Sequence, residues 1–146
     1  MFAAGIRSNR LSMPAKDRYH REIVHALRQA GWHASNKPLN IRIGERDLYP
    51  DILAWQDDGR QIVVEIKVFD SDYSAVHHLM EAVGQYSVYR AAIKKLGLNL
   101  PIYLAVSLEA YEGILSEPLG QLVISNMEIK LLLIDVELAE VVEWKN

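Results

Sequence analysis

The chain contains no cysteine among its 146 residues. This excludes a disulfide framework and every thiolate zinc site, and it suits a reducing cytosol, so we expect a cytoplasmic protein. Apolar runs are short, as in Leu131–Ile134, and none is long enough for a transmembrane helix. The opening MFAAGIRSNRLS has no apolar segment of the kind that secretory signals contain, so a signal peptide is not expected.

Basic charge is also scarce. The formal net charge is −3, and residues 101–146 hold eight acidic residues against two basic ones. Proteins that bind nucleic acid usually carry a strong basic stripe, which this sequence lacks. Charge alone therefore favours a solvated acidic face. Any contact with nucleic acid must be local, assisted by a metal ion, or assisted by a partner.

The composition that remains is that of one globular domain, with 50% hydrophobic and 24% charged residues. A chain of this length buries roughly two thirds of its unfolded surface and needs no structural metal to fold. We expect residues 13–146 to form a single domain. Residues 1–12 show no periodicity and precede Met13, so we expect a flexible N-terminal extension there.

The spacing of apolar residues predicts an α/β domain with a mixed β-sheet flanked by helices. Pro14 suits a helix start and Gly31 a helix end, and Asp58-Gly59 predicts a hairpin turn. The expected order is α-β-β-β-α-β plus a C-terminal α/β tail. The elements are a helix at 14–31, an alternating stretch at 39–43, strands at 48–55 and 61–68, a helix at 74–96, a strand at 101–107, short helices at 108–115 and 118–124, and strands at 127–134 and 139–144.

Charged side chains interrupt two otherwise apolar strands, at Asp51 in the first and at Glu65 and Lys67 in the second. Because side chains alternate along a strand, Glu65 and Lys67 share one face. If a five-residue loop closes the hairpin, Asp51 lies directly opposite Glu65, with Cβ atoms about 5 Å apart. The opposite face of the second strand is apolar and holds Val64, Ile66 and Val68.

Two opposed carboxylates repel each other. A hard divalent cation relieves that repulsion, because Mg²⁺ binds one or two carboxylates together with phosphate oxygens and water. Such an ion polarises a phosphoryl oxygen and lowers the pKa of bound water, and Lys67 could orient or deprotonate that water. The alternative is an ion pair of Lys67 with Glu65 or Asp51 on a solvated face, and spacing alone leaves both interpretations open.

The stretch Pro50-Asp51, thirteen residues, then Glu65-Ile66-Lys67 resembles the PD-(D/E)XK nuclease signature. Gln85 and Tyr89 lie four apart on one helix face and resemble the Gln-x-x-x-Tyr motif of its RecB-like branch. The resemblance implies a restriction-endonuclease-like (PD-(D/E)XK) core that uses Mg²⁺ or Mn²⁺.

The metal ligands implied by this resemblance are Asp51, Glu65 and the carbonyl of Ile66, whose side chain points away. The implied catalytic residues are Asp51, Glu65, Lys67 and Gln85. Lys67 would act on the attacking water, and Gln85 would position water or phosphate.

Nearly the whole chain from Met13 onward is similar to the fdxN-element excision controlling factors of XisH type. The matching stretches include MPAKD at 13–17, DLY at 47–49, VEIK at 64–67, AVGQY at 82–86 and EPLGQ at 117–121. This resemblance implies a role in site-specific excision of a DNA element. The implied partners are DNA, a small XisI-type protein and a site-specific recombinase, without a membrane. A homo-oligomer remains open.

Several other residues have two interpretations. His20 projects with the apolar face of the first helix, where RecB-like nucleases often place a metal-site residue, yet a lone histidine there is more often part of the core. We treat His20 and Tyr89 as supporting residues. Adjacent His77 and His78 diverge by about 100° on a helix and do not chelate together. Asp47 suits either an outer acid of the site or a cap of the turn before it. Expected phosphate contacts are Arg42, Arg46, Arg60, Arg90, Lys94 and Lys95.

Two functions follow from these patterns. The first is a metal-dependent DNA endonuclease-like domain. The second is a catalytically silent nuclease-fold scaffold that binds a partner protein, which the acidic C-terminal third favours. We expect DNA to meet the front near Lys67, Arg90 and Lys94, and a protein to meet the acidic back.

Overall fold

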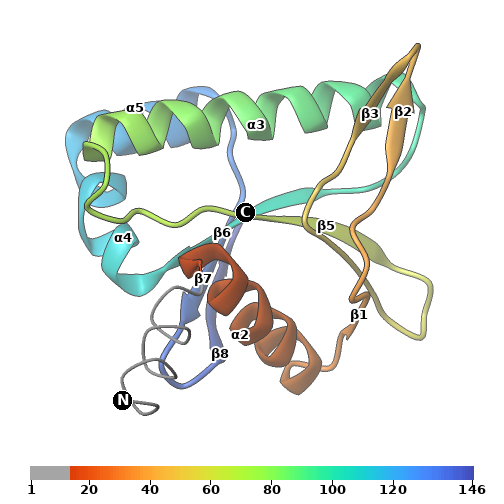
Figure 1. Ribbon diagram of the computed structural model, residues 1–146, viewed down its shortest axis with the longest axis horizontal. Helices are drawn as coiled ribbons and strands as arrows, with labels where there is room; N and C mark the ends of the chain where they lie inside the picture. Colours follow the sequence, from red (N-terminus) through yellow and green to blue (C-terminus); the bar gives the residue numbers. More distant parts are fainter. Residues whose placement is uncertain (1–13) are drawn as a thin grey trace, which may run out of the picture.

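The computed structural model describes residues 14–146, so the extension expected at residues 1–12 lies outside the described residues. Figure 1 shows the arrangement of the elements. In chain order they are α2 (Ala15–Gln29), β1 (His33–Ala34), β2 (Ile41–Ile43), β3 (Arg46–Leu48), β4 (Ile52–Trp55), β5 (Gln61–Ile66), α3 (Ala75–Lys95), β6 (Ile102–Ser107), α4 (Leu108–Glu112), the 3-10 turn η1 (Ile114–Ser116), α5 (Pro118–Asn126), β7 (Leu131–Asp135) and β8 (Glu140–Lys145).

Six strands form one mixed sheet in the order β1-β4-β5-β6-β7-β8. The central strands β5, β6 and β7 are parallel, whereas β4 and β8 run antiparallel to their neighbours. The long helix α3 connects β5 to β6 and is the crossover that a parallel pair requires. The predicted α/β domain with a mixed sheet is therefore confirmed.

The ends of the two main helices lie where the sequence signals predict. α2 begins directly after Pro14, and α3 begins directly after Ser74, whose hydroxyl accepts a hydrogen bond from the His77 amide at 3.1 Å. Each helix is followed by a glycine with positive φ, Gly31 at 92° and Gly97 at 68°. Glycine reaches this conformation without strain, so it ends a helix readily.

The alternation of side chains along β5 divides the core between the two faces of the sheet. Val63 packs into the cluster that contains α3, while Val64 and Ile66 pack into the cluster that contains α2. In Figure 1, α3 lies above the strands and α2 below them. The predicted apolar face of β5 is confirmed, and alternation puts Glu65 on the α3 side with Val63.

The prediction of one strand over 48–55 is wrong in its first half. Leu48 ends β3, which pairs with β2 in a separate two-stranded sheet, and β4 begins only at Ile52. The break falls at Pro50, which has no N–H to contribute to a ladder. Asp47 lies in that separate hairpin, where its Oδ2 is 3.0 Å from Arg42 Nη1. It therefore belongs to a different element from Asp51.

The C-terminal third covers one face and ends the sheet. Residues of α4 and η1 join the cluster beneath α3, among them Ala110, Ile114 and Leu115. The strand expected at 127–134 begins only at Leu131, because the chain turns at Glu128, which has a φ of 52°. Within residues 14–146, β8 is the last strand of the sheet, beside β7. No helix among residues 14–146 is both long enough and apolar enough to cross a membrane.

Candidate active site

Asp51 and Glu65 interlock at the point where β4 and β5 begin to separate. The hairpin pairs Ile52 with Val64, and continuing this register places Asp51 opposite Glu65 as predicted. The Asp51 amide donates to Glu65 Oε1 at 3.0 Å, and the Ile66 amide donates to Asp51 Oδ2 at 2.9 Å. The Glu65 carboxylate is thus held by the amide of Asp51 itself, and the Asp51 carboxylate by the amide of the residue that follows Glu65.

Pro50 gives this end of the hairpin its unusual bonding. The amides of Val63 and Lys67 donate to carbonyls on the β6 side, at 2.9 and 3.0 Å. Amide directions alternate along a strand, so Ile66 points its N–H and its carbonyl toward the β4 side. The position opposite Ile66 is Pro50, which has no N–H to donate. Pro50 therefore supplies no ladder donor to the carbonyl of Ile66, the residue whose amide binds the Asp51 carboxylate.

Glu65 is a carboxyl in an unfavourable environment, with 1% of its surface exposed. Burial, and secondly the charge of Asp51, raise its pKa to about 8, while the charge of Lys16 partly opposes the shift. At neutral pH and without a cation, the protonated form of Glu65 is favoured. Binding of a cation by both carboxylates would release that proton.

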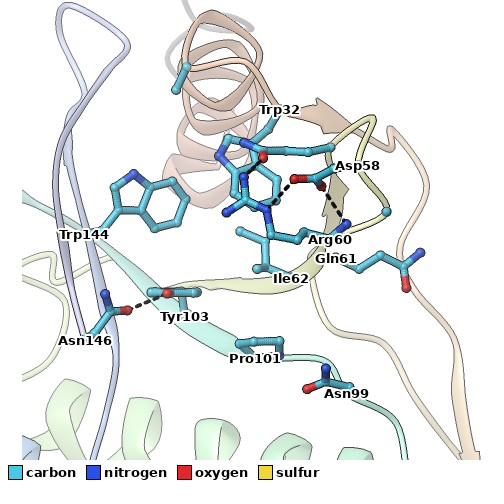
Figure 2. Close-up of a pocket in the computed structure, with 13 residues that line it drawn as sticks. Trp32, Asp58, Arg60, Gln61, Ile62, Asn99, Pro101, Tyr103, Trp144 and Asn146 are labelled. Carbon is cyan, nitrogen blue, oxygen red and sulfur yellow. Dashed lines mark hydrogen bonds and ion pairs between the residues drawn. The ribbon is translucent and has the colours of Figure 1, made fainter.

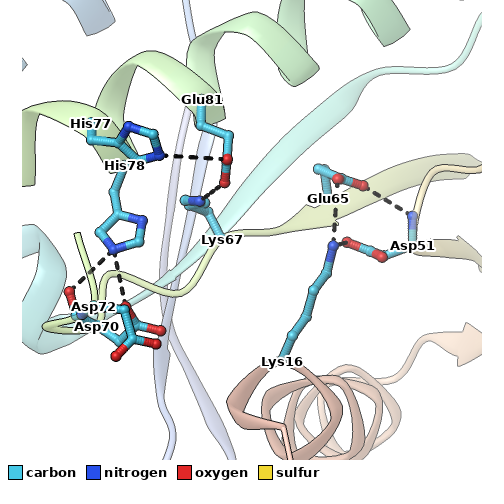
Figure 3. A network of polar contacts seen from close by, with 9 residues as sticks. All are labelled: Lys16, Asp51, Glu65, Lys67, Asp70, Asp72, His77, His78 and Glu81. Carbon is cyan, nitrogen blue, oxygen red and sulfur yellow. Dashed lines mark hydrogen bonds and ion pairs between the residues drawn. The ribbon is translucent and has the colours of Figure 1, made fainter.

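Lys16 from the first turn of α2 reaches the carboxylate pair. Its Nζ lies 3.1 Å from Asp51 Oδ2 and 3.9 Å from Glu65 Oε2. Figure 3 shows the Lys16 side chain directed at the two acids. Sequence reasoning gave Lys16 no role. The available signal is a lysine in a first helical turn, where the helix dipole disfavours a cation.

Lys67 points elsewhere along the same face. It is 7% exposed and its ammonium donates to Glu81 on α3, not to Asp51 or Glu65. The structure therefore has neither ion pair considered for Lys67 in the sequence. The hydrogen bond from Lys67, followed by its charge, lowers the pKa of Glu81. Glu81 is the second residue that sequence reasoning missed, because only the packing of α3 on β5 brings it to Lys67.

A cavity of about 390 Å³ opens beside these groups, with Lys16, Lys67, Glu81 and Gln85 on its walls. Gln85, predicted to position water or phosphate, thus shares a cavity with Lys67. Tyr89 lies one turn further along α3. Burial, and secondly the negative charges of Glu65 and Asp51, raise the pKa of its hydroxyl to about 12. The structure accordingly gathers Gln85 and Tyr89 near the strand residues.

The ligand set suits magnesium. Among residues 14–146, no three His, Asp or Glu side chains are grouped as a metal site. Asp51 and Glu65 with the Ile66 carbonyl supply three oxygen donors, and Mg²⁺ commonly leaves its other positions to water and phosphate. The buried carboxylate of Glu65 and the half-buried one of Asp51 also need a positive charge when both are ionised. The residues present therefore fit a divalent cation.

The histidines contribute less. His20 is half-buried and makes no hydrogen bond or ion pair with another described residue, so the structure does not join it to Asp51 or Glu65. His78 is buried, and its Nε2 lies 3.1 Å from Asp70 Oδ1. His77 instead stacks on Tyr73 with ring centroids 4.4 Å apart. The predicted divergence of His77 and His78 is confirmed.

None of the six residues predicted to contact phosphate lines the cavity of Lys67 and Gln85. Arg42 pairs with Asp47, and Arg46 is exposed in the same hairpin. Arg90 donates to the carbonyls of Met127 and Glu128 at 2.6 and 3.3 Å, so it fixes the turn before β7. Lys94 is exposed near the end of α3. Their role toward nucleic acid stays a prediction.

A larger cavity of about 880 Å³ lies at the other end of β5, where Gln61 and Ile62 line it. Figure 2 shows its aromatic and amide side chains. Trp144 contacts Trp32 and Tyr103, with ring centroids 5.8 and 5.0 Å apart. None of the residues predicted for catalysis or metal binding lines this cavity. The larger cavity and the predicted catalytic residues therefore lie at different ends of β5.

Comparison with known proteins places the chain in a family. No curated protein matches it. Solved structures resemble it, among them two crystal structures that are each 32% identical. One is a fdxN element excision controlling factor protein from Anabaena variabilis, with a TM-score of 0.83 over 89% of this chain and 99% of that one. The other is an XisH family protein from Nostoc punctiforme, with a TM-score of 0.82 over 88% of this chain and 99% of that one. The profile described as XisH protein matches residues 13–142. The chain belongs to the XisH family.

Proposed function

We propose that this protein is an excision controlling factor for a DNA element and carries a divalent-metal-dependent endonuclease-like site on a PD-(D/E)XK core. The Anabaena protein described as a fdxN element excision controlling factor supports the first half of this proposal. The interlocked pair of Asp51 and Glu65, with Ile66 between them and Lys67, carries the second half. Mg²⁺ or Mn²⁺ is the proposed cofactor, and DNA is the proposed substrate.

Each residue has a distinct task in this proposal. Asp51, Glu65 and the Ile66 carbonyl hold the cation, which when bound supplies positive charge to the scissile phosphate and lowers the pKa of its water. Lys67 leaves Glu81 to orient the attacking water or to neutralise charge on the phosphate. Gln85 lines the same cavity and donates to water or to a phosphate oxygen.

Cleavage of supercoiled plasmid DNA tests this proposal. The purified full chain, alone and with the XisI-type protein, is incubated with Mg²⁺ or Mn²⁺ and compared with the variant Lys67→Ala. We expect metal-dependent nicking that falls about 100-fold or more in Lys67→Ala. Lys37→Ala, at an exposed lysine, is the matched control and should cleave normally. If no nicking appears in any arm, or if Lys67→Ala nicks as well as the control, the endonuclease assignment is wrong.

A second candidate function is a scaffold that binds a protein, such as an XisI-type partner or a recombinase. The observation that favours it is the edge strand β8. Val142 within β8 is 48% exposed and Leu138 in the turn before it is 64% exposed, beside exposed acids at Glu137 and Glu140. An exposed strand edge with apolar side chains accepts a further strand readily. In this alternative the carboxylate pair stays with Lys16 and no cleavage occurs.

A further inference from the structure

Lys16 occupies a position that helix stability does not explain. It lies in the first turn of α2, where the helix dipole favours acidic residues such as the neighbouring Asp17. Its ammonium lies 3.1 Å from Asp51 Oδ2 and 3.9 Å from Glu65 Oε2, within reach of both acids at once. Lys16 therefore supplies the positive charge that the carboxylate pair needs when no metal ion is there.

The two sides of this contact differ in freedom. The side chain of Glu65 is 2% exposed and that of Asp51 16%, whereas that of Lys16 is 47% exposed. The acids are also fixed by main-chain hydrogen bonds, whereas the contacts of Lys16 with other residues of the described part of the chain are these two ion pairs. If a divalent cation competes for the carboxylates, Lys16 is the group that moves.

The place to which Lys16 can turn is already built. Lys16 lines the cavity of about 390 Å³ that Lys67 and Gln85 also line, together with the acids Asp70, Asp72 and Glu81, the last of which pairs with Lys67. Two lysines from different elements, α2 and the end of β5, thus face one space beside the carboxylate pair. Paired cations of this kind suit a phosphate group, because lysine binds phosphate as a compact point charge.

We propose that Lys16 is an exchangeable cation of this site. In the resting protein it balances the charge of Asp51, leaves the carboxylate pair when a divalent cation binds, and then binds a backbone phosphate of DNA in the cavity opposite Lys67. This inference rests on the proposed metal-dependent function and adds a regulatory and phosphate-binding residue to it. Metal binding and DNA binding are thereby coupled, since the first releases the residue that serves the second.

Replacing Lys16 by methionine separates the two roles, because methionine keeps an unbranched apolar side chain and removes the charge. Titration calorimetry with Mn²⁺ on the full chain should show binding about tenfold tighter in Lys16→Met than in the native protein. Binding of a short DNA duplex in Ca²⁺ should be weaker in Lys16→Met, with a salt dependence reduced by about one ion. Lys37→Met, at an exposed lysine, should change neither quantity.

A measurement on the native protein guards against a folding defect in the variant. Acetylation of individual lysines, followed by mass spectrometry, should show Lys16 becoming more reactive when Mn²⁺ is added and less reactive when DNA follows. Lys37 should react equally in all three states.

The outcomes distinguish this inference from the function on which it rests. Equal Mn²⁺ affinity in the native protein and Lys16→Met, with unchanged Lys16 reactivity, overturns the exchange while the metal site stands. Tighter Mn²⁺ binding with unaltered DNA binding overturns the phosphate role. No Mn²⁺ binding in either protein overturns the proposed function and the inference together.

Discussion

At its N-terminal end β5 contributes Gln61 and Ile62 to a cavity of about 880 Å³, whereas at its C-terminal end it contributes Ile66 and Lys67 to a cavity of about 390 Å³. The first is walled by Trp32, Tyr103 and Trp144, whose rings pack on one another. The second is bordered by charged side chains from α2 and α3. One short strand therefore ends in two different environments.

The two ends of β5 contribute differently to the stability of the folded state. Aromatic packing removes apolar surface from water and stabilises the folded state. Two buried carboxylates do the opposite, and a nearby cation at best offsets their desolvation. The acids at the C-terminal end are therefore better explained by chemistry than by stability, although their cavity is the smaller of the two.

The largest expected difference between the two ends of β5 is that Glu65, at the charged end, makes the free energy of unfolding depend on pH. Folding raises its pKa from 4.5 to about 8, so between these values the folded state holds a proton that the unfolded chain releases. The free energy of unfolding in chelator should therefore fall by roughly 3 kcal/mol as the pH rises from about 5 to about 8. Denaturant unfolding of the native protein and of Glu65→Gln at several pH values measures this loss, which the variant should lack. Parallel pH profiles would contradict the burial of a titrating Glu65.

The aromatic end should respond to truncation instead. Trp144→Ala removes the ring that contacts Trp32 and Tyr103, and it should lower the free energy of unfolding by about 2–3 kcal/mol at every pH. Val142→Ala on the same strand is the control, since Val142 is 48% exposed and should cost less than about 0.5 kcal/mol. Equal effects of the two variants on urea midpoints would show that the ring cluster contributes little.

Metal ions should stabilise the folded protein through the charged end of β5 and not through the aromatic end. At about ten times the dissociation constant, Mg²⁺ or Mn²⁺ should raise the free energy of unfolding by about 1.4 kcal/mol. Asp51→Asn should abolish this increase and leave the metal-free protein as stable as before or more so, because acid–acid repulsion is relieved. Thermal melts with and without metal test this, and Trp144→Ala should keep the full metal-induced shift. An unchanged shift in Asp51→Asn would exclude the carboxylate pair as the metal site.

The smallest effect on stability is expected at the exposed edge, away from both ends of β5. Glu137→Lys combined with Glu140→Lys should change the free energy of unfolding by less than about 0.5 kcal/mol. Co-purification with the partner protein should weaken, because electrostatic complementarity sets specificity, and DNA binding should stay intact or improve slightly. Loss of DNA binding with the partner still bound would reverse the assignment of the two faces.

Much of the local structure was predictable because it depends on neighbours in sequence. Pro14 and Gly31 bound α2, and Ser74 and Gly97 bound α3, through capping and backbone preferences that act over a few residues. The five-residue loop before Gln61 sets the hairpin register and hence the opposition of Asp51 and Glu65. The strand break at Pro50 was missed, since apolar residues continue through it while the main-chain donor is lost.

By itself, then, the sequence determined the helices, the hairpin register and the opposition of two acids, one within β5 and one directly before β4, because chain connectivity and side-chain periodicity impose them. Only the tertiary structure decided which cations meet those acids. Lys16 reaches them from the first turn of α2, and Lys67 meets Glu81 because α3 packs over the face of the sheet that Lys67 shares with Glu65. Such contacts join residues far apart in the chain, and their charges interact strongly only after folding has removed the water between them.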